Sequence, residues 1–416
     1  MSPRRLYLDN AATSFPKPRT VLEAMNRYAM ELGASAGRGA YVEAIESGKL
    51  IEACRRRLNQ LFNGGGANQF VFTLNCTEAL NLAIKGLIDP RDGAEDRGHA
   101  ICTAIDHNSI LRPLTALVER GWLESQTRMP VDANTGLVDP DDIRRAIRPD
   151  TKLIAITHVS NVTGTVQPIR EIGAIARERG VPFIVDAAQS AGHLPIDLTK
   201  DLVDLLAAPG HKGLLGPLGT GFLYIRPGLE QTLMPLVEGG TGSISEEPRQ
   251  PDFMPDRFES GSHNAIGIAG LSEGVKWILD QGIERIAAHE MDLVRSFLDG
   301  IGDIEGLTYF GPQGVKDRTG VFSVRVEGLQ PQEFSAILET HYGILTRSGL
   351  HCAPMAHETI GTLDSGGTTR FSFGPFLVQQ DIKFVTDAIA EIAGKNESGF
   401  CHEATKEHEG FTKKSI

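Results

Sequence analysis

The sequence predicts an α/β fold with a large domain on a mostly parallel sheet and a smaller α+β domain. Short apolar runs alternate with helical patterns between residues 69 and 225, and each run is continuously apolar. Continuous apolar strands that alternate with helices indicate a parallel sheet covered on both faces. The alternation gives way to loop-like sequence before residue 263, which indicates a second domain. Such sheets bind ligands beyond the carboxyl ends of their strands.

The composition is that of a globular protein long enough for two domains. The chain has 416 residues, of which 41% are hydrophobic and 23% charged. A net charge of −12 and a pI near 5.5 argue against a nucleic-acid surface. The basic run Arg55–Arg57, beside Glu52, is interpreted as a solvated helix face. No apolar stretch approaches the roughly 18 residues of a membrane span, and no signal core follows Met1, so a cytoplasmic protein without membrane contact is expected.

The cysteines indicate neither a disulfide framework nor a zinc site. There are 5, an odd number, and they are scattered without CxxC spacing. Cys54 and Cys102 lie in apolar patterns and are predicted to be core residues. Cys401 and His402 lie in a polar tail, and we expect no metal there.

The first elements are a short strand and a helix. Residues 6–8 form an apolar run, and apolar residues at helical spacing follow from Val21 to Leu32. Thr20 is the predicted N-cap and Gly33 the predicted stop. In the next loop, the Arg38 guanidinium lies between glycines and is a candidate for reaching into a cleft to bind substrate. The alternative is a solvent-exposed loop arginine.

From residue 69 onward strands and helices alternate. The predicted strands are 70–74, 100–105, 153–157, 183–185, 202–206 and 222–225, and the helices between the first four are 77–87, 109–120 and 169–180. Polar residues follow five of the strands: 77–78, 106–108, 158–161, 186–189 and 211–212. Any one of these groups is explained by capping or turn structure, but five together predict a site. The Thr77 hydroxyl, at the start of a helix, would face an anion.

Lys212 is the central candidate of this site. It ends an apolar run in a turn flanked by Gly210 and Gly213, where the backbone can approach a ligand closely. A lysine shielded from water loses proton affinity and becomes a nucleophile that can form an imine with an aldehyde cofactor. The alternative is an ordinary surface lysine in a turn.

The remaining sequence indicates a smaller domain. Residues 16–262 are assigned to the large domain, and residues 263–394 to the small one, which the segment 1–15 is expected to join. Helices are predicted at 265–281, 283–301, 331–342 and 379–393, with strands at 321–326, near 344 and at 371–373. Residues 395–416 are polar and without pattern, and are interpreted as a partly disordered tail.

The strand-end residues together resemble a known enzyme class. The matching segments are Thr77–Ala79, Asp106–His107, Asn161–Gly164, Asp186–Gln189 and Gly210–Lys212. They are similar to fold-type I enzymes of the class V aminotransferase branch, and the resemblance runs from about Tyr7 to Ala393. It implies a mostly parallel seven-stranded sheet in the large domain and pyridoxal 5′-phosphate as cofactor.

Within that branch the chain resembles the cysteine desulfurases of group II. The resemblance rests on Arg347–Pro354, which reads Arg-Ser-Gly-Leu-His-Cys-Ala-Pro, and on Arg370. Cys352, beside His351, is the candidate nucleophile that takes sulfur as a persulfide. The alternative is an inert small apolar residue. Arg370 offers a bidentate fork for a substrate carboxylate. The spacing from Cys352 to Arg370 is slightly long for this group.

The resemblance also implies roles for the other candidates. Lys212 would form the cofactor imine and carry the α-proton, and Asp186 would pair with the pyridinium nitrogen. His107 would stack on the ring, and it counts with Lys212 and Cys352 as catalytic. Gln189 would hold the ring hydroxyl, and Asn161 would lie near that hydroxyl and the substrate carboxylate.

The phosphate contacts implied are Thr77 and His211, together with Ser262 from a neighbouring subunit, so a homodimer with composite sites is expected. Two positions depart from the family pattern. Pro209 stands where a serine hydroxyl often contacts the phosphate, and Leu350 stands where a second histidine is common. A phosphate donor is therefore missing at residue 209.

The resulting prediction is a cysteine desulfurase that converts L-cysteine to L-alanine and leaves a persulfide on Cys352 for an acceptor protein or thiol, for example in iron–sulfur cluster assembly. A selenocysteine lyase would use the same residues. A class V transaminase, epimerase or carbon–sulfur lyase would use the same cofactor, and Cys352 would then be incidental. A sulfur-carrier or scaffold protein would keep the fold without catalysis, but the Lys212, Asp186, His107 and Arg370 set argues against it.

Overall fold

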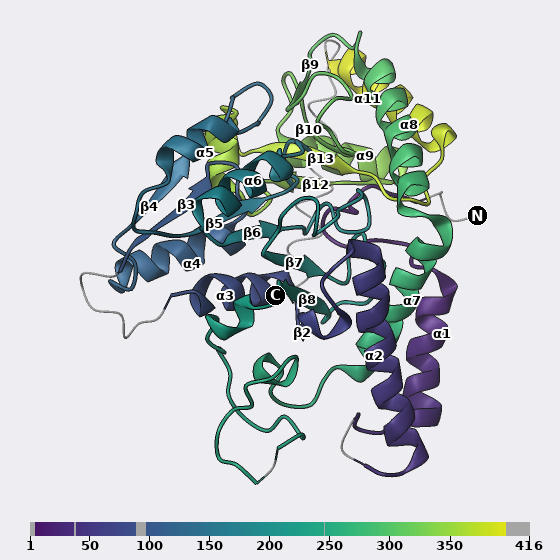
Figure 1. Ribbon diagram of the computed structural model, residues 1–416. Helices are drawn as coiled ribbons and strands as arrows, with labels where there is room; N and C mark the ends of the chain where they lie inside the picture. The colour runs from purple at the N-terminus through teal and green to yellow at the C-terminus, as the bar shows by residue number, and fades with distance from the viewer. Residues whose placement is uncertain (1–4, 37–38, 89–96, 245, 397–416) are drawn as a thin grey trace, which may run out of the picture.

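The computed structural model describes residues 5–36, 39–88, 97–244 and 246–396 (Figure 1). Arg38 and residues 397–416 of the predicted tail, with Cys401 and His402, lie outside these described residues. The predicted start of the tail is wrong, because residues 395 and 396 belong to the last helix, Gln379–Asn396. Across the described ranges, no helix is long and apolar enough to cross a membrane.

The large sheet confirms the predicted fold class. Within the described residues it has seven strands in the order β2-β8-β7-β6-β5-β3-β4. Only β8 runs antiparallel to its two neighbours, and the other pairings are parallel. The strands are β2 (Phe70–Thr73), β3 (His99–Thr103), β4 (Ser125–Met129), β5 (Thr151–Thr157), β6 (Phe183–Asp186), β7 (Leu205–Pro209) and β8 (Gly221–Ile225).

Alternation of side chains across this sheet produces two core clusters. Phe70 and Phe72 point into one cluster, with α2 (Val42–Phe62), α6 (Ile169–Arg179) and α7 (Ala265–Gln281). Val71 points into the other, with α3 (Cys76–Gly86) and α4 (Asn108–Glu119). Because successive strand residues face opposite sides, a strand buried on both faces must be apolar throughout. The continuous apolar runs in the sequence have this cause.

The first helix has an α-helical part that is followed by a π-helical part. α1 (Arg19–Arg27) continues as a π-helix through Tyr28–Leu32 and ends at Gly33, whose φ of +58° lies in the left-handed region. The predicted stop at Gly33 is confirmed, and the predicted N-cap is wrong. Pro18, with extended backbone, holds the N-cap position, so Thr20 lies inside the first turn. α1, α2 and α7 run side by side (Figure 1).

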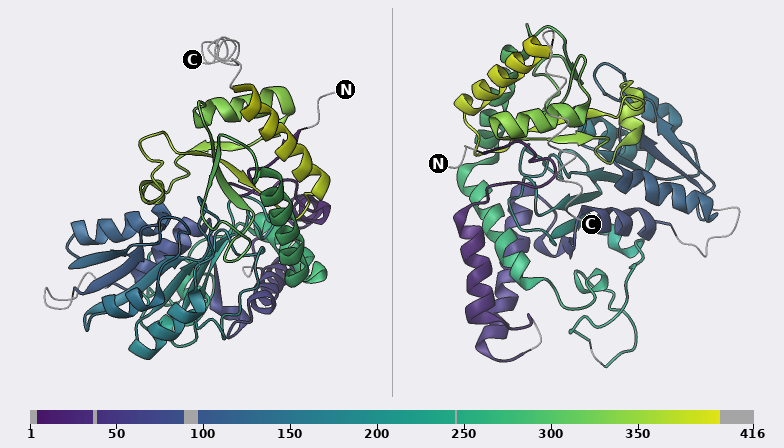
Figure 2. Two further views of the ribbon diagram at one scale, coloured as in Figure 1. Left: turned by 90° about the horizontal axis from the view of Figure 1, so that it is seen from above. Right: turned by 180° about the vertical axis from the view of Figure 1, so that it is seen from behind.

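A second, antiparallel sheet has the order β12-β13-β10-β9. Its strands are β9 (Leu307–Phe310), β10 (Val321–Val326), β12 (Arg347–Gly349) and β13 (Thr368–Ser372). Elements of the same region are α8 (Ile283–Ile301), α9 (Pro331–Tyr342) and α11 (Gln379–Asn396). Figure 2 shows these elements, in green and yellow, gathered at one end of the molecule.

The N-terminal segment joins this end of the molecule before it crosses to the large sheet. β1 (Leu6–Tyr7) pairs in parallel with β11 (Ile344–Leu345), and Leu8 lies in the core cluster of the second sheet. The described α7 instead packs against α1 and α2. The domain boundary between residues 262 and 263 stays a prediction.

The basic run is not wholly a solvated face. Arg56 is exposed and paired with Glu52, but Arg55 is only 4% exposed. Its Nη1 and Nη2 donate to the two carboxylate oxygens of Glu259 at 2.7 and 2.5 Å. The backbone N–H of Phe72 donates to the same carboxylate at 2.6 Å. The solvated interpretation is therefore wrong for Arg55, which joins α2, β2 and the segment before Ser262.

Candidate active site

A cavity lies at the carboxyl ends of the parallel strands, where the sequence predicts a ligand. It encloses about 500 Å³ of space free of protein atoms, its open mouth included. Seven of the predicted site residues line it together: Thr77, His107, Asn161, Asp186, Gln189, His211 and Lys212. Pro209, Cys76 and Ser109 line it as well. The predicted convergence of strand-end residues is therefore present in the structure.

Lys212 follows β7 and is partly buried at the cavity wall. Loss of hydration lowers the pKa of its amine, although Asp186 opposes this shift. Among the described residues, no side chain or carbonyl accepts a hydrogen bond from this amine. Lys212 thus combines a lowered proton affinity with an amine that is available to a ligand.

Asp186 ends β6 and is 2% exposed. Its Oδ1 accepts a hydrogen bond from the Ala188 N–H at 2.8 Å and one from the Cys76 thiol at 3.4 Å. Burial, and then the charge of Asp186, raise the pKa of Cys76, so this thiol stays protonated and donates. Both bonds go to Oδ1, which leaves Oδ2 without a donor in the described part of the chain.

A chain of hydrogen bonds connects His107 with Thr77 through Ser109. The Ser109 backbone N–H donates to His107 Nδ1 at 3.1 Å, and Ser109 Oγ lies 2.9 Å from that nitrogen and 2.8 Å from Thr77 Oγ1. Burial lowers the pKa of His107. The ring is therefore neutral at pH 7, and because Nδ1 accepts, Nε2 carries the proton.

Sequence reasoning missed Ser109 and Cys76. Ser109 sits two residues after His107 in the first turn of α4, where a serine is normally read as a cap. Cys76 is the first residue of α3 and directly precedes Thr77. The available signal was their position beside predicted site residues at helix starts.

The end of the cavity formed by α3 and His211 has groups that suit an anion. The first turn of a helix has N–H groups without intrahelical acceptors, and Thr77 lies in this turn. Asn75 caps the helix by accepting from the Glu78 N–H at 2.9 Å. Burial lowers the pKa of His211 to about 4, and its buried Nδ1 has no hydrogen-bond partner among the described residues. Pro209 lines this cavity without a side-chain donor.

Some strand-end polar residues are structural. Asp106 is completely buried and accepts hydrogen bonds from the backbone N–H groups of Thr103 and Thr157, both at 2.6 Å. It therefore ties the end of β3 to the end of β5. His158 is also buried, and neither residue lines the cavity.

Asn161 and Gln189 connect the cavity wall to other segments. Gln189 donates from Nε2 to the carbonyl of Ala11 at 3.0 Å. Asn161 donates from Nδ2 to the carbonyl of His351 at 2.7 Å. Each amide group thus holds a segment that comes from a distant part of the sequence.

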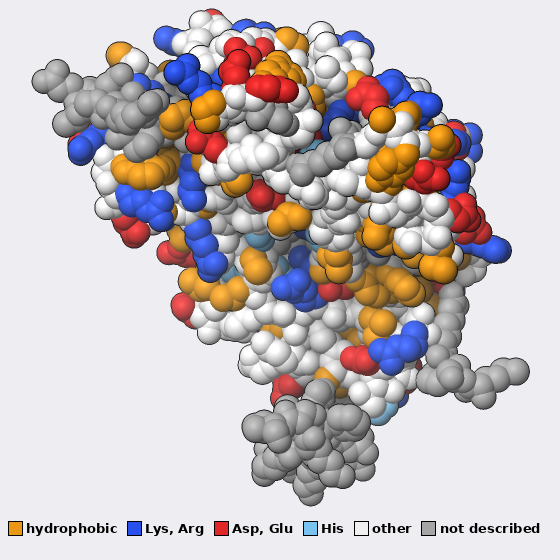
Figure 3. Space-filling view, turned by 90° about the horizontal axis from the view of Figure 1, so that it is seen from below, with side chains coloured by type: hydrophobic (Ala, Val, Ile, Leu, Met, Phe, Trp, Pro, Cys, Tyr) orange, Lys and Arg blue, Asp and Glu red, His pale blue; other side chains and the backbone are white. Residues whose placement is uncertain are grey.

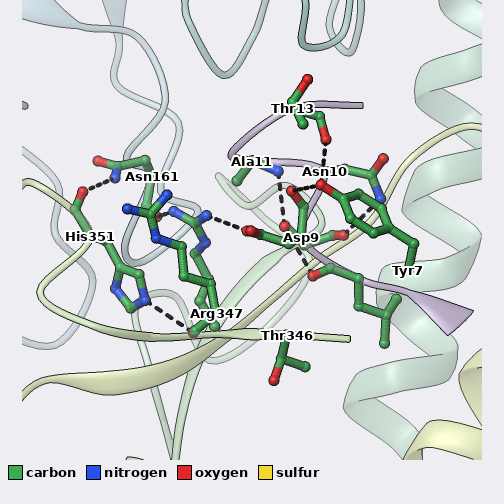
Figure 4. Close-up of polar contacts among 12 residues, drawn as sticks. Tyr7, Asp9, Asn10, Ala11, Thr13, Asn161, Thr346, Arg347 and His351 are labelled. Atoms are coloured by element: carbon green, nitrogen blue, oxygen red, sulfur yellow. Dashed lines mark hydrogen bonds and ion pairs between the residues drawn. The ribbon is translucent and has the colours of Figure 1, made fainter. Parts of the chain in front are cut away.

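Arg370, on β13, is 2% exposed and lies beside the cavity wall. Its Nη2 donates to Asp9 Oδ1 at 2.6 Å, and its Nη1 donates to the carbonyl of Asn161 at 3.2 Å (Figure 4). Its buried Nε has no partner within the described residues. Arg370 raises the cost of charging Lys212 and His107 and so contributes to their lowered pKa values.

Cys352 lies on a turn, residues 350–353, between β12 and α10 (Pro354–Thr359). Its side chain is exposed, whereas Cys54, Cys76 and Cys102 are buried. His351 and Cys352 have φ values of +51° and +57°, a left-handed conformation that is costly outside glycine. The turn is held at the cavity wall because the Asn108 N–H donates to the carbonyl of Cys352 at 3.1 Å.

Two buried histidines, His351 within the Cys352 turn and His357 on α10, contact each other. His351 Nδ1 lies 3.2 Å from His357 Nε2, and His357 Nδ1 lies 2.7 Å from Thr362 Oγ1. Burial lowers the pKa of His351 to about 2 and that of His357 to about 4. Both rings are therefore neutral at pH 7.

Ser262 is not part of the cavity within one chain. It is exposed and lines a separate hollow with Tyr28, Gly33 and residues 261–266.

Figure 3 shows that hydrophobic side chains lie among Lys and Arg side chains on the face seen from below. Across the described residues, no group of His, Cys, Asp and Glu side chains is arranged to hold a metal ion.

The chain matches the family model described as aminotransferase class-V over residues 6–385. A protein of Methanothermobacter thermautotrophicus named "Probable cysteine desulfurase" is 34% identical over 392 residues, which are 94% of this chain and 95% of that protein. The apo structure of a cysteine desulfurase from Thermococcus onnurineus NA1 superposes with a TM-score of 0.86 at 33% identity, covering 94% of this chain and 95% of that one. The S-sulfonic acid form of the Escherichia coli cysteine desulfurase CsdA gives 0.82 at 26% identity, with 92% and 94% covered.

Proposed function

Because the chain belongs to the class-V aminotransferase family, whose members generally use pyridoxal 5′-phosphate, we propose that it is a cysteine desulfurase dependent on this cofactor. The observation that carries the proposal is the pairing of two features. Lys212 and Asp186 face one cavity at the strand ends, and a turn that presents the exposed thiol of Cys352 is held against the wall of that cavity.

The residues of the cavity fit the cofactor. The Lys212 amine and the buried Nδ1 of His211 lack partners among the described residues, so both are free to bind a ligand. Asp186 supplies a carboxylate whose Oδ2 lacks a donor in the same part of the chain. A lysine for the imine, a carboxylate for the pyridinium nitrogen and donors for a phosphate are the groups this cofactor requires.

Some polar side chains of the cavity suit the ring of the cofactor, and others suit its phosphate. Asp186 would pair with the pyridinium nitrogen, and Gln189 and Asn161 would lie at the ring hydroxyl. The neutral ring of His107 would stack on the cofactor ring. Thr77, with the first turn of α3, and His211 would hold the phosphate. Because Pro209 provides no hydroxyl, the helix N-terminus carries more of this task.

When bound, the cofactor draws electrons away from the substrate α-carbon. Lys212 would move the proton that leaves this carbon, since burial lowers the pKa of its amine and so favours the neutral, basic form. The neutral His107 keeps its proton on Nε2 and donates from there. Asn161 and Arg370 would bind the substrate carboxylate, Arg370 through its planar fork.

Cys352 would receive the sulfur. Its thiolate forms a bond to the sulfur of L-cysteine as the bond between that sulfur and the β-carbon breaks, and the β-carbon takes up a proton. The products are L-alanine and a persulfide on Cys352, so the carbon is reduced while the two sulfur atoms are oxidised. No external oxidant or reductant is required.

The exposed position of Cys352 suits transfer of this sulfur to an acceptor protein or a small thiol. Because an exposed thiol survives in a reducing compartment, we also propose a cytoplasmic location. A selenium atom in place of the substrate sulfur would be taken by the same thiol.

We further propose a homodimer in which Ser262 supplies a hydroxyl to the phosphate site of the neighbouring copy. In support, Ser262 is exposed and its own cavity does not contain it. Leu74, Leu218 and Ile266 are 58%, 67% and 41% exposed, which gives the second copy apolar surface to cover.

Subunit mixing tests this dimer. Lys212→Ala and Ser262→Ala proteins are each purified and then mixed under conditions that exchange subunits. A mixed dimer then has one site that combines intact Lys212 and intact Ser262, and the other lacks both. Recovery of activity above that of either variant supports the composite site. A protein that sediments as a monomer at working concentration contradicts it.

The function is tested by measuring L-alanine formed from L-cysteine with a reductant present. We expect wild type to form alanine and Cys352→Ala to lose at least about a hundredfold in rate, because the accepting nucleophile is gone. Cys54→Ala is the matched control: it also removes a thiol, but a completely buried one. Equal alanine formation by wild type and Cys352→Ala would show that the enzyme catalyses another class V reaction.

A further inference from the structure

Asp9 binds the Arg370 guanidinium at Nη2, an atom that takes part in both bidentate binding modes of this group. A guanidinium can bind a carboxylate through its Nη1 and Nη2 or through its Nε and Nη2, so Nη2 belongs to both forks. Asp9 Oδ1 accepts from this Nη2 at 2.6 Å. Nη2 carries two N–H groups, one for each fork, so a carboxylate that takes the fork on the side of Asp9 with both oxygens must displace Asp9.

The guanidinium is otherwise incompletely bound. Nη1 donates to the carbonyl of Asn161, and Nε is buried without a partner in the described residues. A buried donor without an acceptor is costly and points to a ligand that satisfies it. Nε, which has no partner among the described residues, and Nη2, which Asp9 binds, form one of the two forks of the guanidinium. This fork lies on the side of Asp9.

The Asp9 side chain can move away from Arg370 without breaking the hydrogen bonds of its own backbone carbonyl. Its backbone carbonyl is fixed by the Ala12 N–H at 3.0 Å and by the Tyr7 hydroxyl at 3.1 Å, whereas its carboxylate pairs, within the described residues, with Arg370 alone. The Asp9 side chain is 20% exposed and that of Arg370 only 2%. Figure 4 shows Asp9 on the N-terminal segment, between Tyr7 and Arg347.

The charges around this pair favour a second carboxylate. Arg347 faces Arg370 in the register of β12 and β13, and its guanidinium has no acidic partner within the described residues. Arg347 lowers the pKa of Arg370 and that of Lys212, so its positive charge reaches both groups. Arg370 therefore has one carboxylate partner among the described residues, Asp9, and Arg347 adds a second positive charge beside it.

We propose that Asp9 is the resting counter-ion of Arg370, and that the α-carboxylate of the substrate displaces it. Asp9 neutralises a buried guanidinium while the site is free, and it sets how strongly a ligand must bind to take its place. A ligand without an anionic group cannot make this exchange, so Asp9 is a specificity-determining residue. The proposal rests on the proposed function, in which Arg370 binds the substrate carboxylate.

Calorimetric titration of the cofactor-loaded protein with L-alanine, the product, tests the exchange without turnover. We expect Asp9→Asn to bind L-alanine about tenfold more tightly than wild type, because a neutral amide competes less well for a guanidinium than a carboxylate does. L-Alanine methyl ester, which has no carboxylate, should bind both proteins equally. Glu339→Gln is the matched control, since it removes a carboxylate from an exposed ion pair with Arg5.

Unchanged or weaker binding of L-alanine by Asp9→Asn overturns the proposal, because Asp9 would then support Arg370 rather than compete for it. That result leaves the proposed function intact. Arg370→Gln separates the two ideas: if it binds L-alanine as wild type does, Arg370 is not the carboxylate site, and the substrate assignment falls together with the counter-ion. If Asp9→Asn does not fold by thermal denaturation, Asp9→Ser takes its place under the same criteria.

Discussion

The floor and the rim of the cavity are assembled in different ways. The floor consists of Lys212, Asp186 and His107 with Ser109 and Thr77, and each of these residues ends a strand of the large sheet or lies shortly after one. The rim consists of Arg370, Asp9 and the Cys352 turn, which come from the second sheet and from the N-terminal segment. Asp9 and Arg370, which form an ion pair, are 361 residues apart in the sequence.

The two regions also differ in how their polar groups are satisfied. On the floor, Ser109 connects His107 with Thr77 through hydrogen bonds between residues at most 32 positions apart in the sequence, so the geometry is fixed before any ligand arrives. At the rim, Arg370 is bound to Asp9, which a substrate carboxylate would have to replace. We therefore expect the large sheet to set the position of the cofactor and the contact between the two sheets to set the choice of substrate.

Removing Lys212 gives the largest effect expected on the floor. Lys212→Ala should lose at least about a thousandfold in rate, since proton transfer by a positioned side chain contributes roughly 10²–10⁴-fold and the covalent attachment is lost too. Borohydride reduction followed by peptide mass spectrometry should place the cofactor on Lys212 in wild type and find no attachment in the variant.

Lys17 provides the control because it is a second lysine near the same turn. Burial lowers its pKa to about 8, and its amine donates to the carbonyl of His211 at 3.2 Å and to Ser14. Since these bonds occupy its amine, Lys17→Met should still be labelled on Lys212. Labelling of Lys17 in wild type would show that the lowered pKa alone, rather than a place in the cavity, selects the lysine.

Ser109→Ala tests whether the floor is prearranged. The variant loses the hydroxyl that bridges His107 and Thr77, but it keeps the backbone N–H that donates to His107. A net hydrogen bond is worth about 1 kcal/mol, so we expect the cofactor to bind roughly five- to tenfold more weakly. Equilibrium dialysis of pyridoxal 5′-phosphate measures this affinity directly.

Ser190→Ala is the matched variant for Ser109→Ala. Ser190 follows Gln189 and is completely buried, and its hydroxyl has no hydrogen-bond partner in the described residues. We expect unchanged cofactor affinity for Ser190→Ala. Equal affinity of wild type and Ser109→Ala would mean that the floor holds its geometry through backbone contacts alone.

The fold, like the cavity, has parts that the sequence predicts well and parts that it does not. The continuous apolar strands and the helices between them could be read from the sequence because burial on both faces leaves a strong signal. β4, at the edge of the sheet, was not predicted, since its residues Ser125–Met129 are mostly polar and partly exposed. Arg55 was misread because a buried arginine looks like an exposed one until its partner, Glu259, is known.

The candidate site was predictable on the floor and much less so at the rim. Strand ends converge by topology, so Lys212, Asp186 and His107 could be brought together without coordinates. Ser109 was missed because a serine at a helix start has a simpler explanation as a cap. The pairing of Asp9 with Arg370 could not be predicted, since no spacing rule connects two segments that meet only through the packing of separate sheets.

The smallest effect expected concerns His357, which contacts His351 of the Cys352 turn. Burial lowers the pKa of His357 in the folded protein to about 4, while an unfolded histidine has a pKa near 6.5. Between these two values the unfolded chain binds a proton that the folded chain does not, so the stability contributed by His357 is lost as the pH falls through this window. His357→Gln cannot take up this proton, and its amide can still bond to Thr362 and His351. We therefore expect the melting temperature of the variant to fall by a few degrees less than that of wild type between pH 7 and pH 5, measured by differential scanning calorimetry. An identical fall in both proteins would show that His357 is reached by water in the folded state, and that the rim is looser than the floor on this side of the cavity as well.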